Sequence, residues 1–143
     1  MSMDSVMRRS LQLTTAFNFL AAFCLAYPAT PLAQLMGLPS GAPLIYRAMA
    51  AGAVALFGLA YGWLSVQPII DRPLVVLSTI GKLAAFGSVV ALTIYGDLPT
   101  RSILMTSPDL LFAVVFICWL HGAQPAVPAD VPASGPAVLR QGR

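Results

Sequence analysis

The stretch LVVLSTIGKLAAFGSVVALTIY, residues 74–95, contains a single charged side chain, Lys82. A helix of about 20 predominantly apolar residues is long enough to cross the hydrocarbon core of a bilayer. Because backbone groups in lipid must be hydrogen-bonded within the segment, an α-helix is the expected conformation of this stretch. The sequence therefore predicts a membrane-spanning helix with one lysine near its middle.

Apolar runs of similar length lie on both sides of this stretch, at residues 11–27, 47–66 and 103–121. They are separated by segments rich in Pro, Gly and Asp, which interrupt helices. The runs lack the alternation of apolar and polar residues that marks a membrane β-barrel. We therefore expect an all-α, polytopic membrane protein, in which residues 11–121 form a bundle of four transmembrane helices.

Shorter segments complete the predicted organisation. Residues 1–10 are expected to form a polar N-terminal segment, and residues 122–143, rich in Pro and Ala, a disordered tail. A short interfacial helix is expected at 32–36. Ser107 and Pro108 have the residue types of an N-cap and a first helical position, so they are a candidate for the true start of the fourth helix.

The composition agrees with lipid as the solvent of this chain. Hydrophobic residues make up 58% of it and charged residues only 9%, whereas soluble domains contain about one quarter charged residues. The net charge of +3 is explained by basic residues at helix ends and in the tails rather than by a nucleic-acid partner. The predicted partner is therefore the lipid bilayer.

The positions of the arginines predict the orientation of the bundle. An even number of crossings places both termini on one side of the membrane. That side carries more arginines than the other: it has Arg8, Arg9, Arg72, Arg140 and Arg143, whereas the other side has Arg47 and Arg101. The positive-inside rule then predicts cytoplasmic termini and a multi-pass protein of the bacterial inner membrane. The Arg8-Arg9 pair also resembles the start of a signal peptide, but without a convincing cleavage site we expect an uncleaved helix.

Small residues four positions apart recur in the second and third runs. Gly58 and Gly62 form one such pair, and Gly81 and Ala85 form another. In lipid, close backbone approach at small residues stabilises helix packing. Packing within the chain is the simpler interpretation, and homo-oligomerisation is the alternative.

Lys82 is the residue that is most costly to place in this predicted interior. An ionised lysine near the middle of a membrane-spanning helix costs roughly 2.5–3.5 kcal/mol. Ser78 and Thr79 share its helical face, and Thr14 and Asn18 form a similar polar stripe on the first run. Because the first and third helices run in the same direction and carry Asn18 and Lys82 at similar depth, we expect these two side chains to face one another.

Two interpretations of this polar interior stay open at the level of sequence. In the first, the Lys82 side chain extends toward the cytoplasmic end of its helix and makes a structural hydrogen bond. In the second, Lys82 and the neighbouring polar side chains bind a ligand or a proton.

Charged side chains at the predicted outer end form a second candidate group, composed of Arg47, Asp97, Arg101 and Asp109. Asp109 falls in or near the first turn of the fourth predicted helix, where the helix dipole stabilises a carboxylate. It could also pair with Arg47 or Arg101, and the group would then form a roughly neutral outer vestibule. Because the estimated depths of Lys82 and Asp109 differ by about 10 Å, we expect no contact between them.

Other residue types that carry chemistry are sparse. Cys24 and Cys118 lie in apolar runs without a CxxC pair, and His121 is the single histidine. No nucleophile–base pair or metal-ligand cluster is recognisable, so we expect neither a catalytic nor a metal site. The sequence names no cofactor, and an enzyme is the weakest of the functional hypotheses.

The order of these features resembles the small bacterial DoxX-like membrane proteins, which are chains of four transmembrane helices. The resemblance covers residues 11–121 and rests on Tyr27-Pro28, Tyr46-Arg47, Gly81-Lys82 and Pro108-Asp109. The resemblance implies a bundle of four transmembrane helices. Some members of the family are linked to quinone-dependent oxidoreductase complexes. The resemblance offers no catalytic residue to carry over.

Three functions therefore remain in contention. The first is a small membrane protein that binds a lipophilic molecule, such as a quinone or a lipid, or serves as the membrane partner of a redox enzyme. The second is a structural accessory subunit of a larger membrane complex. The third is a small transporter, with Lys82 and Asp109 as ion-coupled residues.

Overall fold

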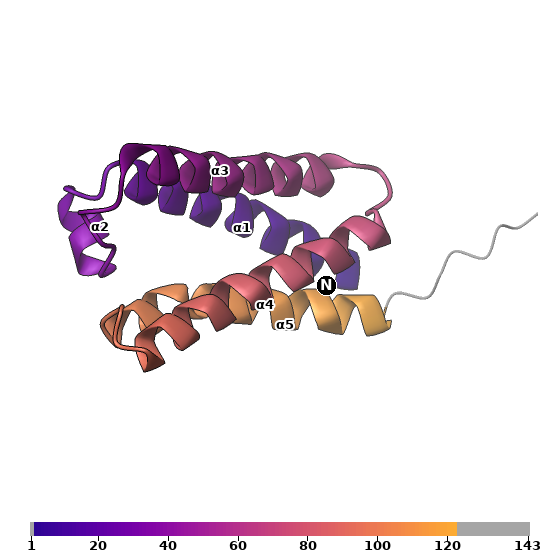
Figure 1. The fold of residues 1–143 in the computed structure, drawn as a ribbon. Coiled ribbons are helices and arrows are strands. Elements are labelled where there is room, and N and C mark those ends of the chain that lie inside the picture. Colours follow the sequence, from indigo (N-terminus) through magenta and orange to yellow (C-terminus); the bar gives the residue numbers. More distant parts are fainter. Residues whose placement is uncertain (1, 123–143) are drawn as a thin grey trace, which may run out of the picture.

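The computed structural model describes residues 2–122, and in this range the chain folds entirely into helices and loops (Figure 1). The helices are α1 (Met3–Ala26), α2 (Pro31–Leu35), α3 (Leu44–Val66), α4 (Arg72–Ile94) and α5 (Arg101–Gly122). Three of them, α3, α4 and α5, are long and apolar enough to cross a membrane. The all-α class is confirmed, and the three apolar helices indicate a multi-pass membrane protein.

The helix boundaries differ from the predicted ones mainly in α1. This helix begins at Met3 rather than Leu11, because Ser2 caps its N-terminus by accepting a hydrogen bond from the Ser5 amide. Residues 3–10 are therefore helical and not a separate polar segment. The short helix predicted at 32–36 is present as α2. Of the disordered tail predicted at 122–143, Gly122 belongs to α5, and the rest lies outside the described residues.

The long helices pack as two hairpins. α1 packs along α3, and α4 packs along α5, while a smaller contact between α1 and α5 joins the two pairs. Figure 1 shows the hairpins close together at the end where α1 begins and α5 ends, and farther apart at the end that carries α2. The fold is thus packed at one end and open at the other.

Apolar side chains fill the packed end. The core there consists of Met7, Leu11, Tyr61, Leu64, Ile70, Val75, Phe116 and Trp119. Removing this apolar surface from water would not stabilise the contact in lipid, so van der Waals packing and hydrogen bonds hold the helices together. The packed end therefore depends on close fit and on the polar contacts at its rim.

Two arginines at this rim each bind carbonyls at the C-terminal end of the partner helix in their own hairpin. Arg8 of α1 donates to the Ser65 carbonyl in the last turn of α3 (2.8 Å) and to the Pro68 carbonyl in the loop that follows (2.9 Å). Arg72 donates to the Leu120 carbonyl of α5 (2.7 Å). The last carbonyls of a helix lack intrahelical donors and carry partial negative charge, so a guanidinium stabilises them.

Glycines of α3 allow α1 to approach closely. A Cβ added to Gly58 would lie 3.3 Å from the Cβ of Asn18, and one added to Gly62 would lie 3.4 Å from Thr15. These distances are tight for carbon atoms, so larger residues would push α1 and α3 apart. The expected packing of the Gly58 and Gly62 face within the chain is confirmed.

The predicted start of the fourth helix at Ser107-Pro108 is wrong. α5 begins at Arg101, and Pro108 lies inside it. Proline lacks the amide that would bond to the Leu104 carbonyl one turn earlier. The Ser107 hydroxyl donates to this carbonyl instead, at 2.7 Å, so the helix continues through the proline with its acceptor satisfied.

We expect Ser107→Ala to lower the free energy of unfolding by about 1 kcal/mol, because the Leu104 carbonyl then lacks a donor. The loss should vanish in a Pro108→Ala background, where the restored amide of residue 108 bonds to Leu104. Reversible unfolding in mixed micelles, followed by circular dichroism, measures both. An equal loss in both backgrounds would contradict this role of Ser107.

Candidate functional site

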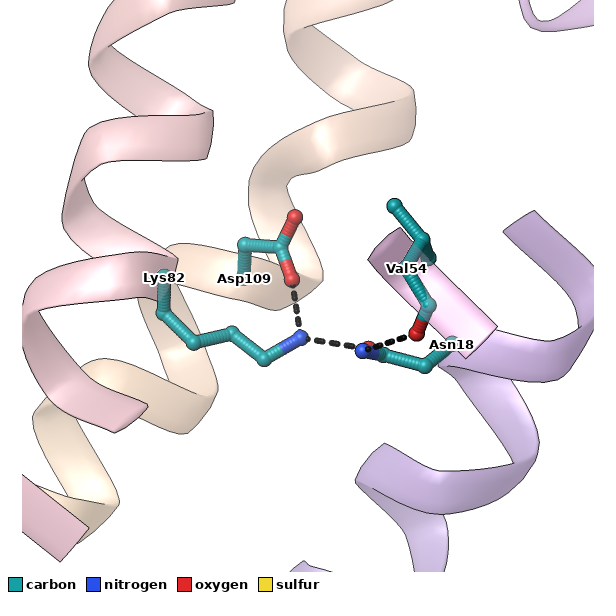
Figure 2. Close-up of polar contacts among 4 residues, drawn as sticks. All are labelled: Asn18, Val54, Lys82 and Asp109. Carbon is teal, nitrogen blue, oxygen red and sulfur yellow. Dashed lines mark hydrogen bonds and ion pairs between the residues drawn. The ribbon is translucent and has the colours of Figure 1, made fainter. Parts of the chain in front are cut away.

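A buried ion pair lies where the packed end of the bundle meets the open end. The Lys82 ammonium of α4 donates to Asp109 Oδ1 of α5 at 2.5 Å and to Asn18 Oδ1 of α1 at 2.8 Å. The Asn18 amide in turn donates to the Val54 carbonyl of α3 at 3.3 Å. Figure 2 shows the Lys82 side chain crossing from its helix to Asn18, with Asp109 approaching the same nitrogen. The chain of contacts joins all four long helices.

The predicted contact between Asn18 and Lys82 is present, and the expectation that Lys82 and Asp109 do not touch is wrong. That expectation placed Asp109 in the first turn of its helix. Because α5 begins at Arg101, Asp109 lies about 12 Å along the helix axis. It therefore reaches the depth of the Lys82 ammonium instead of capping a helix.

The Lys82 ammonium also lies among aromatic rings. Its nitrogen is 5.5 Å from the ring centre of Phe17, 5.4 Å from that of Tyr61 and 5.6 Å from that of Phe112. A cation within about 6 Å of an aromatic ring is attracted by its electron-rich face. Only 4% of Lys82 is exposed, so its ammonium lies inside the bundle, and the structural hydrogen bond of the first interpretation is present in the contact with Asn18.

Sequence reasoning missed these rings, although one signal was present. Phe112 follows Asp109 by three residues and Phe17 precedes Asn18 directly. Side chains three apart on a helix share a face, so Phe112 could have been placed beside Asp109. Tyr61 has no such signal, because its position depends on how α3 packs against α1.

The remaining interior candidates, Ser78, Thr79 and Thr14, are buried in the bundle. Ser78 and Thr79 donate to the carbonyls one turn earlier in α4, those of Leu74 (2.7 Å) and Val75 (2.8 Å). Within residues 2–122, the Thr14 hydroxyl is buried without a hydrogen-bond partner. The polar stripe predicted on α1 and α4 is therefore interior, but of it only Asn18 and Lys82 reach the cavity.

Asp109 does not join the predicted outer vestibule. Asp97 and Arg101 are exposed at the loop between α4 and α5, and Arg47 lies near Leu25 and Tyr46. Asp109 pairs with Lys82 rather than with Arg47 or Arg101. The part of the prediction that pairs Asp109 with Arg47 or Arg101 is therefore wrong.

A cavity of about 290 Å³ lies beside the ion pair, toward the open end of the bundle that carries α2. Its lining combines the polar groups of Asn18, Lys82, Thr106 and Asp109 with apolar and glycine residues: Phe17, Ala21, Leu25, Met36, Leu38, Ala53, Val54, Phe57, Tyr61, Gly81, Ala85 and Met105. Sites for small molecules are typically apolar hollows of about 300–1,000 Å³ with a few polar groups. This cavity has that character, at the small end of the range.

The loop around α2 covers the cavity at the spread end. Met36 and Leu38 line it, and the Met36 carbonyl accepts a hydrogen bond from the Ser102 hydroxyl of α5 at 3.1 Å. Gly37 adopts φ +74°, and an added Cβ would lie 2.6 Å from Ser102 Oγ. Only glycine fits this close approach, which holds the loop of one hairpin against the other.

The side between α3 and α4 is less closed. Along the described chain their backbones have few close contacts, and the Phe57 ring of α3 is the side chain that approaches Gly81 of α4. Ala53 and Phe57 of α3 and Ala85 of α4 line the cavity and are also exposed on the surface. The cavity therefore reaches the surface between α3 and α4, where a bilayer would surround the helices.

The polar end of the cavity retains unused hydrogen-bonding capacity. A lysine ammonium has three donors, and Asn18 and Asp109 occupy two of them. The Asn18 amide keeps one N–H, and the carboxylate keeps its second oxygen. These groups can bind a small polar head group. Within residues 2–122, no three His, Cys, Asp or Glu side chains are placed to hold a metal ion.

Comparisons of this chain with protein-family models, with curated proteins and with solved structures found no match. The fold and the site by themselves define its class. It is a multi-pass helical membrane protein with a buried, hydrogen-bonded ion pair at the polar end of an apolar cavity.

We expect Lys82→Met to lower the free energy of unfolding by about 3–5 kcal/mol, because the Asp109 carboxylate is then buried without its counterion. The double variant Lys82→Met/Asp109→Leu should recover most of this loss, since no unpaired charge remains. Unfolding of the purified variants in mixed micelles measures the difference. A single variant as stable as the wild type would show that the pair is not a buried ion pair.

Proposed function

We propose that this chain binds a lipophilic molecule, such as a quinone or a lipid, in the cavity between its two helix hairpins. The observation that carries the proposal is the apolar cavity with one polar end, formed by Lys82, Asp109 and Asn18. An amphiphile can place its head group at this end and its apolar part along the walls. Service as the membrane partner of a redox enzyme is compatible with such binding.

The proposal includes a fourth membrane-spanning helix, α1, and cytoplasmic termini in a bacterial inner membrane. α1 packs along the apolar helix α3, so the two are expected to share the bilayer. The start of α1 and the end of α5 lie at the same end of the bundle (Figure 1). Arg8, Arg9 and Arg72 lie near this end, which supports a cytoplasmic location under the positive-inside rule. A count of four membrane-spanning helices is also what the resemblance to DoxX-like proteins implies.

The transporter hypothesis named Lys82 and Asp109, and their contact gives it some support. Transport also requires access to the site from both sides of the membrane. On the packed side of the ion pair, however, the side chains of Tyr61, Phe116 and Leu11 are almost completely buried in the core. The arrangement therefore favours binding through the opening between α3 and α4 over passage through the bundle.

Reporter fusions test the proposed topology. A reporter that is active only in the cytoplasm should be active when fused after Arg143 and inactive when inserted between Gly96 and Pro99. The reverse pattern would contradict the orientation, and activity at both positions would contradict a membrane-spanning α4–α5 hairpin.

Filling the cavity should remove the bound molecule. Protein extracted directly into nanodiscs is expected to carry a lipophilic molecule that mass spectrometry of an organic extract identifies. Ala85→Trp should reduce its occupancy about tenfold or more, the equivalent of 1.4 kcal/mol, because Ala85 lines the cavity. Ala84→Trp is the matched control, since Ala84 is exposed and does not line it. Equal occupancy in both variants, or a wild-type protein that binds no lipophile, would overturn the proposal.

A further inference from the structure

We infer that the cavity selects an uncharged amphiphile, and that the tail of this molecule leaves the protein between α3 and α4. The inference rests on the proposed function and specifies the ligand of the same site. Three observations carry it: the charge of the lining, its free hydrogen-bonding groups, and the side on which the cavity opens.

The lining carries no net charge. Of the residues that line the cavity, Lys82 and Asp109 are the two with charged side chains, and they pair with each other. An anionic head group would compete with Asp109 for the ammonium, and one of the two anions would be left without a counterion. Because an unpaired charge in an apolar interior is very costly, the site disfavours carboxylates and phosphates.

The free polar groups instead match a neutral head group that accepts and donates hydrogen bonds. The third N–H of Lys82 and the second N–H of Asn18 can each donate, and the second oxygen of Asp109 can accept. A hydroxyl, or a carbonyl next to a hydroxyl, would satisfy them without bringing a charge. Satisfying buried donors and acceptors in this way avoids the cost of leaving them unpaired.

The opening between α3 and α4 is the path for the tail. On the opposite side, the rings of Phe17 of α1 and Phe112 of α5 are in contact, with their centres 6.2 Å apart. At the open end of the bundle, the α2 loop covers the cavity and is held by the hydrogen bond from Ser102 to the Met36 carbonyl. A cavity of about 290 Å³ is smaller than most complete ligand sites. The head group therefore fits inside, while a long alkyl chain continues into the surrounding lipid past Phe57 and Ala85.

Competition between matched probes tests the charge selectivity on the wild-type protein. Dodecanol and monolauroylglycerol are the neutral probes, and lauric acid and dodecyl phosphate carry the same chain with an anionic head. Native mass spectrometry in detergent should show at least about tenfold tighter binding of the neutral probes. Preference for the anionic probes would overturn the inference but leave lipophile binding standing. Binding of none of the probes would overturn both.

Asp109→Asn should reverse the selectivity, because Lys82 then becomes an uncompensated cation. We expect the binding of lauric acid relative to dodecanol to rise about tenfold or more. Asp97→Asn is the matched control, since Asp97 is exposed, and should leave the ratio unchanged. An unchanged ratio in folded Asp109→Asn would contradict the charge argument. If this variant does not fold, the wild-type competition still decides the inference.

A photoreactive probe tests the path of the tail. A neutral amphiphile with a diazirine at the middle of its chain should label peptides of α3 and α4 that contain Phe57 and Ala85. Competition with excess dodecanol should remove this labelling. Specific labelling of the outward face of α5, around Leu111 and Val114, would contradict the proposed opening.

Discussion

The buried contact between the Lys82 ammonium and the Asp109 carboxylate is the constraint on which the interior of the bundle depends. Each charge alone would be costly in an apolar environment, so the two helices that carry them must stay in register. The same ammonium binds Asn18, and Asn18 binds the Val54 carbonyl. The pair thus fixes not only α4 against α5 but also the second hairpin against the first.

Other features of the fold follow from bringing these three side chains together. Gly58 leaves room for Asn18 where α1 meets α3. α5 must begin well before Pro108 for Asp109 to reach the interior, and the Ser107 hydroxyl satisfies the carbonyl that the proline leaves free. On one side of the pair the helices are packed tightly, and on the other they spread around a cavity. The contact therefore marks the boundary between the packed and the open parts of the molecule.

The sequence predicted the helical class because long apolar runs have few alternatives in lipid. Helix depth predicted the meeting of Asn18 with Lys82, since two helices of the same direction carry them at similar positions. The same depth argument failed for Asp109, because Ser107-Pro108 has the residue types of a helix start and therefore predicted one. In the structure these two residues lie inside α5, where the Ser107 hydroxyl bonds to the Leu104 carbonyl that the proline leaves without a donor. The start of α1 at Met3 was missed because polar residues before an apolar run do not by themselves show where a helix begins. Neither the aromatic surroundings of Lys82 nor the cavity could be derived, since both depend on the angle between the hairpins.

A charged pair is not the only way to fill the interior of such a bundle. Well-packed apolar residues in place of a buried ion pair are often equally or more stabilising, so stability alone does not require Lys82 and Asp109. What the pair adds is asymmetry: it gives the cavity one polar end, whereas the walls are almost wholly apolar. An amphiphile in such a cavity has only one orientation in which its polar atoms find partners. The ion pair therefore contributes orientation to the cavity, which an apolar interior of equal stability would lack.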